Sequence, residues 1–363
     1  MSSINIESQV FPILAEVNEP LTGQDLLSLE AVSQVQCLDG HLSCKLTLGY
    51  PGESYKEVVT SLGECLAQLD DVEKVSIDAT WQAPTNASVD GKKPIANVRN
   101  VIAVASGKGG VGKSTTTANL ALAMSALGAR VGVLDADIYG PSQAKMLGTE
   151  GQKPEIRDQK AMIPIMAHGV QTMSMAYLLS DNTPAVWRGP MATGALQQMI
   201  FQTDWDDLDY LFVDMPPGTG DIQLTLSQQV PVSGAVIVTT PQDIALLDAK
   251  KAIEMFAKVN IPVLGVIENM AVHNCSQCGH EEHIFGKGGG ERIASDYNTQ
   301  MLAALPLALS IREHADSGNP SVLAEPESRI AQHYNSAALQ IAASLWQQQL
   351  AGNDLPEIAI SDD

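Results

Sequence analysis

Between two apolar segments the chain reads Gly107-Lys108-Gly109-Gly110-Val111-Gly112-Lys113-Ser114-Thr115. This run matches the phosphate-loop pattern G-x-x-x-x-G-K-[ST], in which glycines let the backbone turn its N–H groups toward phosphate oxygens. In that pattern Lys113 lies against the β- and γ-phosphates, and the Ser114 hydroxyl suits Mg²⁺. Residues 101–105 predict a buried strand before the loop, and residues 114–127 predict a helix after it. The run therefore predicts a nucleotide-binding unit whose helix N-terminus faces the phosphates.

The composition is that of an acidic chain with an ordinary core. Of its 363 residues 45% are hydrophobic, and the formal net charge is −21. Nucleic acids and anionic membranes attract clustered Lys and Arg, so this charge argues against both as partners. Residues 1–7 lack the features of a secretory signal, and no stretch is as long as a membrane span. Because the five cysteines are an odd number, we expect a cytoplasmic protein in a reducing compartment.

The N-terminal part of the chain has the pattern of a small α+β domain, which we place at residues 1–81. It combines an alternating strand at 42–48 with an amphipathic helix at 55–69 and a last strand at 72–77. Residues 82–98 contain prolines, Asn, Ser and Gly, a composition typical of a linker.

The second part, residues 99–350, alternates short apolar runs with helical patterns. Besides 101–105, the runs that fit buried strands are 131–134, 210–213, 235–239 and 263–267. This alternation predicts an α/β fold, a doubly wound and mostly parallel sheet with helices on both faces. The acidic tail, residues 351–363, is predicted to be disordered.

Carboxylates follow two of the predicted strands, at Asp135, Asp137 and Asp214. Ligands of open parallel sheets lie beyond the carboxyl ends of the strands, so these side chains should converge near the phosphates. Asp214 fits the carboxylate that organises Mg²⁺, and Asp137 fits a residue that positions the attacking water. For Asp135 the interpretation as a cap or turn former remains equally open.

A cysteine pair, Cys275-Ser276-Gln277-Cys278, follows another strand end. Two thiolates with this spacing can bind one metal ion or one edge of a cluster, but they do not complete a site. A second chain could supply its own pair, or the two thiols could act as a redox dithiol. A Cys₂His₂ zinc knuckle is the third completion, with its histidines drawn from His273, His280 and His283. For the other cysteines we expect buried or incidental thiols: Cys37, Cys44 and Cys65.

Several further motifs lie at the ends of the predicted strands and in the loops that follow them. They are Asp135-Ala136-Asp137-Ile138-Tyr139-Gly140-Pro141-Ser142, Trp187-Arg188-Gly189-Pro190-Met191, Asp209-Tyr210-Leu211, Asp214-Met215-Pro216-Pro217-Gly218-Thr219-Gly220-Asp221, Thr240-Pro241-Gln242, Glu268-Asn269-Met270 and Cys275-x-x-Cys278-Gly279. Together with the phosphate loop, they make the large domain resemble the Mrp-type (ApbC/NBP-type) iron–sulfur cluster carrier ATPases. These belong to the deviant phosphate-loop class that includes MinD and ParA, which lack the late cysteine pair.

The resemblance implies a role for each matching position. Lys108 matches a lysine that reaches the nucleotide of a partner chain, and Asn269 matches an adenine contact. The phosphate and Mg²⁺ contacts correspond to Gly107, Gly109, Gly110, Val111, Gly112, Lys113, Ser114 and Thr115. Asp137 matches the switch I carboxylate and Asp214 the switch II carboxylate. Cys275 and Cys278 match the pair that holds a [4Fe–4S] cluster between two chains.

The expected function is therefore an ATP-binding and hydrolysing homodimer that receives a [4Fe–4S] cluster from a donor and passes it to apo-proteins. ATP, Mg²⁺ and the cluster are the implied cofactors. The small domain resembles a cluster-assembly module, but no cysteine stands at Tyr50-Pro51, where the family has a Cys-Pro element. We therefore expect a docking or structural role for the small domain. The alternative for the whole chain is a zinc-stabilised nucleotide switch of the MinD or ParA kind, without a cluster.

Overall fold

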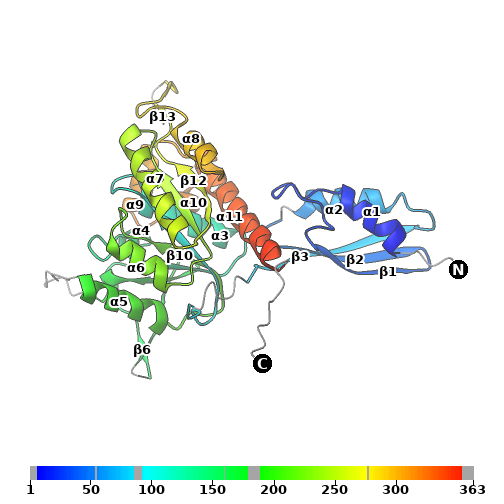
Figure 1. Cartoon of the computed structure of the whole chain (residues 1–363), viewed down its shortest axis with the longest axis horizontal. Coiled ribbons are helices and arrows are strands. Elements are labelled where there is room, and N and C mark those ends of the chain that lie inside the picture. The colour runs from blue at the N-terminus through cyan, green and yellow to red at the C-terminus, as the bar shows by residue number, and fades with distance from the viewer. Residues whose placement is uncertain are drawn as a thin grey trace, which may run out of the picture. The chain divides into compact units, whose positions relative to one another are not determined.

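The computed structural model describes most of the chain, in the ranges 6–53, 55–85, 92–158, 160–178, 189–275 and 278–353 (Figure 1). It contains two compact units, one formed by residues 1–85 together with 342–363 and the other by residues 86–341. The first unit therefore takes in residues 342–350, which the sequence pattern assigns to the large domain. The domain, linker and tail boundaries stay predictions, and residues 86–91 and 354–363 lie outside the described ranges.

The second unit is built on an eight-stranded sheet in the order β15-β12-β11-β4-β10-β5-β9-β8. The strands are β4 (Val98–Ala105), β5 (Val131–Asp135), β8 (Ile165–Ala167), β9 (Val170–Ser174), β10 (Leu208–Asp214), β11 (Gly234–Thr239), β12 (Val263–Glu268) and β15 (Met301–Ala304). All neighbours pair in parallel except β8, which runs antiparallel to β9. The predicted doubly wound, mostly parallel sheet is confirmed.

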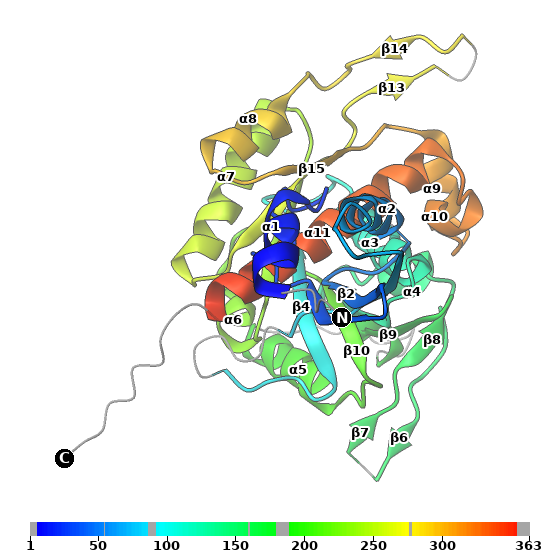
Figure 2. The same cartoon turned by 90° about the vertical axis from the view of Figure 1, so that its right-hand side faces the viewer.

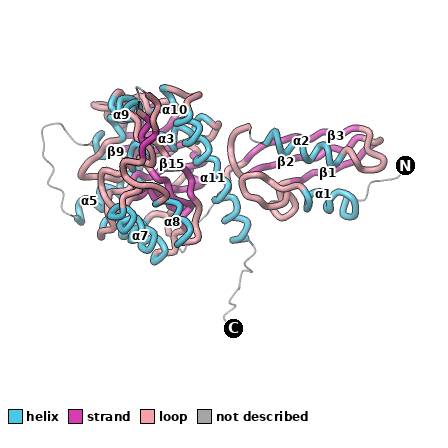
Figure 3. The backbone as a smooth tube through the Cα atoms, turned by 90° about the horizontal axis from the view of Figure 1, so that it is seen from above, coloured by secondary structure: helices cyan, strands magenta, loops and turns pink. Residues whose placement is uncertain are grey.

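Helices cover both faces of this sheet, as the central strands require. Every residue of β5, β10 and β11 is buried, so neither face can be left to water. One face packs into a core cluster with α5 (Gly189–Gln202), α6 (Asp221–Gln229), α7 (Asp243–Lys258) and α8 (Gly289–Asp296). The other face receives α3 (Lys113–Ala126), on the opposite side of the strands from α7 and α8 (Figure 3).

Shorter elements complete the second unit. They are α4 (Gln143–Met146), β6 (Ile156–Arg157), β7 (Ala161–Met162), the 3-10 turn η2 (Met175–Tyr177), β13 (His273–Asn274), β14 (Glu281–Glu282), α9 (Leu309–Asp316), α10 (Ser321–Ala324) and the first part of α11 (Arg329–Asn353). Because β4, β5, β10, β11 and β12 are parallel, the loops that follow them leave from one edge of the sheet. The predicted site residues belong to these loops.

The first unit is a three-stranded sheet in the order β1-β2-β3 with helices on one face. Its elements are η1 (Ile6–Val10), α1 (Phe11–Glu16), β1 (Val32–Leu38), β2 (His41–Leu48), α2 (Tyr55–Leu66) and β3 (Lys74–Trp81). β2 pairs antiparallel with β1 and parallel with β3. Alternate residues of β2 are buried, from Leu42 to Leu48, which confirms the predicted half-buried strand.

The C-terminal end of α11 belongs to this first unit. The ring of Trp346 meets that of Tyr50 edge-on, with 6.2 Å between centroids. A Cβ at Gly49 would lie 2.0 Å from the indole Cγ, so only glycine admits the indole here. Gln347 donates a hydrogen bond to the Thr22 carbonyl at 3.1 Å. Residues from both ends of the chain thus form one core.

Candidate functional site

The phosphate loop connects β4 to α3 and takes the backbone shape that its glycines allow. Gly110 and Gly112 have positive φ angles of 80° and 84°, and Gly112 caps α3. The Asn269 side chain, which follows β12, donates from Nδ2 to the Val111 carbonyl at 2.9 Å. A Cβ at Gly112 would lie 2.1 Å from that nitrogen. Asn269 is therefore packed directly against the loop.

Lys113 and Asp214 form a buried ion pair at the carboxyl edge of the sheet. Asp214 is fully buried and Lys113 is 6% exposed. The Thr117 hydroxyl lies 3.2 Å from Asp214 Oδ1, and Ser114 Oγ lies 3.2 Å from Lys113 Nζ. The switch II candidate thus touches the loop lysine.

Gln143, at the start of α4, hydrogen-bonds to three parts of the site: the phosphate loop, Asp135 at the end of β5 and Asp214 at the end of β10. Its Nε2 donates to Asp214 Oδ2 and to the Ser114 carbonyl, both at 2.9 Å. Its backbone N–H donates to Asp135 Oδ2 at 3.0 Å. The amide side chain is 1% exposed, so it is fixed between the phosphate loop and two strand ends.

Asp135 is a structural acceptor at the base of the segment that carries Asp137. Its carboxylate also accepts hydrogen bonds from the backbone N–H groups of Asp137 at 3.2 Å and Ser142 at 2.9 Å. Burial, and then the charge of Asp214, raise the pKa of Asp135 to about 7. Burial also raises the pKa of Asp137, against the lowering effect of Lys113. The expected convergence of the three carboxylates beside the loop is confirmed.

Lys108, the additional lysine of the loop, is half-buried. Its Nζ lies 3.5 Å from Gln242 Oε1, in the turn before α7. Its backbone carbonyl accepts a hydrogen bond from Ser106 Oγ at 2.9 Å. Its action on a partner chain stays a prediction. Trp187 and Arg188, quoted among the sequence motifs, lie outside the described residues.

The cysteine pair lies at the end of a short hairpin formed by β13 and β14 (Figure 2). The backbone N–H of Cys275 donates to the His280 carbonyl, and that of Gly279 donates to the Cys275 carbonyl, both at 2.9 Å. Cys275 is half-buried and Cys278 is exposed. Ser276 and Gln277 lie outside the described residues.

In two of the histidines considered for a zinc knuckle, Nδ1 binds a main-chain carbonyl and does not face the thiols. His283 Nδ1 donates to the Ala271 carbonyl at 2.8 Å, and His273 Nδ1 to that of Leu307 at 3.2 Å. In the described part of the chain, no group of three or more His, Cys, Asp or Glu side chains is arranged to hold a metal ion.

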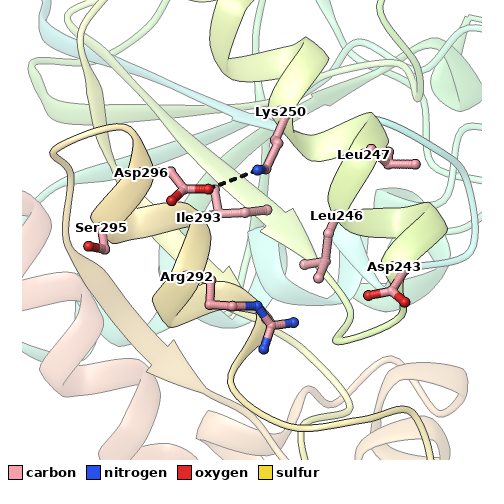
Figure 4. Close-up of a pocket in the computed structure, with 9 residues that line it drawn as sticks. Asp243, Leu246, Leu247, Lys250, Arg292, Ile293, Ser295 and Asp296 are labelled. Atoms are coloured by element: carbon pink, nitrogen blue, oxygen red, sulfur yellow. Dashed lines mark hydrogen bonds and ion pairs between the residues drawn. The ribbon is translucent and has the colours of Figure 1, made fainter.

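A separate cavity of about 480 Å³ lies between α7 and α8 (Figure 4). It is lined by Leu246, Leu247 and Ile293, with the ion pair of Lys250 and Asp296 (2.8 Å) at its edge. This cavity is not at the phosphate loop. Within the described residues, no helix is both long and apolar enough to cross a membrane.

Sequence reasoning missed Thr117, Gln143 and Gln242 as parts of the site. Thr117 lies one helical turn after Ser114. Helical spacing therefore predicts that both side chains face the same edge of the sheet. Gln143 directly follows the Asp135–Ser142 motif, but its reach to Asp214 depends on how α4 folds back. Gln242 belongs to the quoted Thr240-Pro241-Gln242 motif, without a predicted contact to Lys108.

Comparison with known proteins decides the family. Residues 97–342 match the model of the NUBPL iron-transfer P-loop NTPase family. The chain belongs to this family. Residues 7–78 match the model of an iron–sulfur cluster assembly protein. The expected kinship of both parts of the chain is therefore confirmed.

Individual relatives support the assignment to this family. An iron–sulfur cluster carrier protein of Pseudomonas fragi is 61% identical over 77% of this chain and 98% of its own length. One from Escherichia coli is 48% identical over 96% of this chain and 95% of its own length. A nucleotide-binding protein from Archaeoglobus fulgidus, solved in complex with ADP, superposes with a TM-score of 0.57 at 36% identity. That alignment covers 65% of this chain and 92% of the other.

Proposed function

We propose that this P-loop NTPase binds and hydrolyses ATP, holds a [4Fe–4S] cluster between two copies of the chain, and transfers it to apo-proteins. One observation carries the proposal: Asn269, packed on the phosphate loop, is followed by Cys275 after only six residues. Six residues span at most about 20 Å even when fully extended. The proposed nucleotide site and the cysteine pair, of which Cys278 is exposed, are therefore joined by one short segment that leaves β12.

The residues at the loop fit ATP with Mg²⁺. Ser114, Asp137 and Asp214 offer hydroxyl and carboxylate oxygens, the hard ligands that Mg²⁺ prefers. Bound Mg²⁺ would neutralise charge on the phosphates. The loop N–H groups from Gly107 to Gly112, with Thr115 after them, would bind phosphate oxygens, and Lys113 would add a positive charge.

The other side chains divide the remaining tasks. Asp137, only half-buried and beside Lys113, would orient the attacking water. Gln143 would keep Asp214 in place, and Asn269 would contact the adenine. Lys108 would reach the phosphates bound to the second chain, where it adds charge that a single chain does not supply.

The cluster is the cargo of this protein. A [4Fe–4S] cluster takes four thiolates, and Cys275 and Cys278 give each chain two, so two chains make one site. The exposure of Cys278 leaves such a cluster open to an acceptor protein. We place this chemistry in the cytoplasm, where thiols stay reduced. Two relatives bear the name iron–sulfur cluster carrier protein, which supports the cargo, and the ADP complex supports the nucleotide.

For the first unit we propose a docking or structural role. Tyr50, at the position of the family's Cys-Pro element, is buried and donates from its hydroxyl to Glu19 at 2.7 Å. Burial raises the pKa of the Cys44 thiol to about 11, which keeps it protonated and poorly nucleophilic. Neither residue suits cluster binding.

Anaerobic reconstitution with iron and sulfide tests the cargo. We expect about four irons per two chains in the wild type, loss of iron in Cys275→Ala and Cys278→Ala, and retention in the control His280→Ala. One zinc per monomer, lost in His280→Ala or His283→Ala, would instead establish the zinc-stabilised switch.

A mixing experiment tests the dimer. Lys108→Ala chains should regain partial ATP hydrolysis when mixed with chains made hydrolysis-dead by Asp137→Asn. The rescue arises because an intact Lys108 would then face an intact nucleotide site across the interface. Absence of rescue at every mixing ratio would argue against a lysine that acts on the partner chain.

A further inference from the structure

The last residue of β12, Glu268, has a role that no sequence motif explained. Its side chain is 4% exposed, and Oε2 accepts a hydrogen bond from the backbone N–H of Gly290 at 2.5 Å. Gly290 lies in the first turn of α8, where unpaired N–H groups favour a negative charge. Glu268 therefore caps α8 from the strand that precedes the cysteine hairpin.

Two glycines make this contact possible. A Cβ at Gly290 would lie 2.9 Å from Glu268 Cβ, and one at Gly289 would lie 2.7 Å from Leu246 Cδ1 of α7. Real Cβ atoms do not come so close to their neighbours, so a larger residue at Gly290 would push α8 away from β12, and one at Gly289 would push it away from α7. The glycine run before and within α8 lets the helix begin directly against the strand end.

The same strand end holds the phosphate loop. Asn269, the next residue, donates to the Val111 carbonyl. Its backbone N–H donates to the Thr239 carbonyl at 2.7 Å, which fixes it to the neighbouring strand β11. Neighbouring residues thus bind two different elements: Asn269 binds the loop and Glu268 binds α8.

The two arms of the cysteine hairpin connect this end of β12 to α8. The outgoing arm runs from Asn269 to Cys275, and the returning arm runs from Cys278 to α8. His283 of the returning arm donates to Ala271 of the outgoing arm, which joins the two at their base. The far end of α8 is held to α7 by Lys250 and Asp296, across the cavity between the two helices (Figure 4).

We propose that Glu268 is a positioning residue that couples the phosphate loop to the cysteine pair. A nucleotide-dependent shift of the loop displaces Asn269, and with it the strand end. Because Glu268 holds α8, the returning arm moves with the outgoing arm, and both cysteines change position together. Without the Glu268 contact the strand end would lose its hold on α8, and only the bonds between the two arms, such as that of His283 with Ala271, would link the returning arm to the loop. The inference rests on the proposed function, since it takes the loop as the nucleotide site and the thiols as cluster ligands.

Thiol reactivity in the metal-free protein tests this coupling. The background carries Cys37→Ser and Cys65→Ser, so that the remaining accessible thiols are Cys275 and Cys278. The rate of maleimide labelling is measured with and without Mg²⁺-ATP, and the association state is measured in the same samples. For the parent we expect a change in rate of about five-fold or more upon nucleotide addition.

Glu268→Ala should bind ATP and associate as the parent does, but lose most of the nucleotide-dependent change in labelling rate. Glu268→Gln keeps an oxygen that can accept from Gly290 and should restore part of the change. The matched control is Glu291→Gln, an exposed carboxylate in the first turn of the same helix, which should behave as the parent.

Three results would overturn the inference. They are a parent whose labelling rate ignores the nucleotide, a Glu268→Ala protein that responds as the parent does, and a Glu268→Ala protein that no longer binds ATP. Glu268→Gln gives the decision if the alanine variant does not fold. Failure of the proposed function is distinguishable, because it appears as absent iron in the reconstituted wild type and not in thiol labelling.

Discussion

Replacing Gly112 by alanine should damage the phosphate loop in two separable ways. The residue has φ 84°, and an L-residue pays about 1–2 kcal/mol to adopt the left-handed region. The new Cβ would also lie 2.1 Å from Asn269 Nδ2 and displace that side chain. The Asn269–Val111 hydrogen bond that is then lost contributes about 0.5–1.5 kcal/mol. We expect Gly112→Ala to lower the free energy of unfolding by about 1.5–3.5 kcal/mol in total.

Gly110→Ala is the matched control. Gly110 has a similar φ of 80°, but nothing lies within 4 Å of the Cβ that alanine would add. Only the cost of the backbone conformation applies, about 1–2 kcal/mol. Urea titration of both variants without nucleotide measures the difference, which we expect to be about 0.5–1.5 kcal/mol. Equal losses would refute the argument that Asn269 is packed against the loop.

Three further predictions concern the charged groups of the site. Lys113→Ala should lower ATP hydrolysis by about 10²–10³-fold in a steady-state assay, since it removes a charge that faces the transferred phosphoryl group; unchanged turnover would contradict this. Asp137→Asn should lower kcat by about 10²-fold with little change in ATP affinity; a loss confined to affinity would show that Asp137 does not orient water. The raised pKa of Asp135, about 7 against an ordinary 3.8, means that the folded chain binds a proton there more tightly than the unfolded chain. The free energy of unfolding should therefore fall as pH rises from about 4 to 7, a slope that Asp135→Asn should reduce; identical slopes would exclude this titration.

Sequence reasoning found the strands that build the centre of the fold because they are buried on both faces. The run Tyr210–Val213 is apolar throughout, and so is the segment at 101–105, which makes each visible without knowledge of its neighbours. The peripheral strands β8 and β15 were not predicted. They are three and four residues long and include exposed positions, so their composition does not separate them from loops.

The site was predictable where one short segment carries the information. The phosphate loop fixes Lys113 by its own pattern, and the position of Asp214 at a strand end brings the two together. Gln143 was not predictable, because its contact with Asp214 joins residues 71 positions apart and depends on the backbone after Asp135. Glu268 was quoted within a motif but without a role for a similar reason, since its partner is a main-chain N–H, which every residue but proline offers.

The contact of Trp346 with Gly49 and Tyr50 has a consequence for the order in which the chain folds as it is synthesised. Residues 6–85 emerge from the ribosome well before the helix end that contributes Trp346 to their core, which is made roughly 260 residues later. At about 5–20 residues per second the first unit would wait roughly 13–50 s for its final piece. During that time the surface around Tyr50 lacks its indole partner. The first unit is therefore completed only after the second unit has been synthesised, and a chain truncated before Trp346 should leave the core of the first unit open.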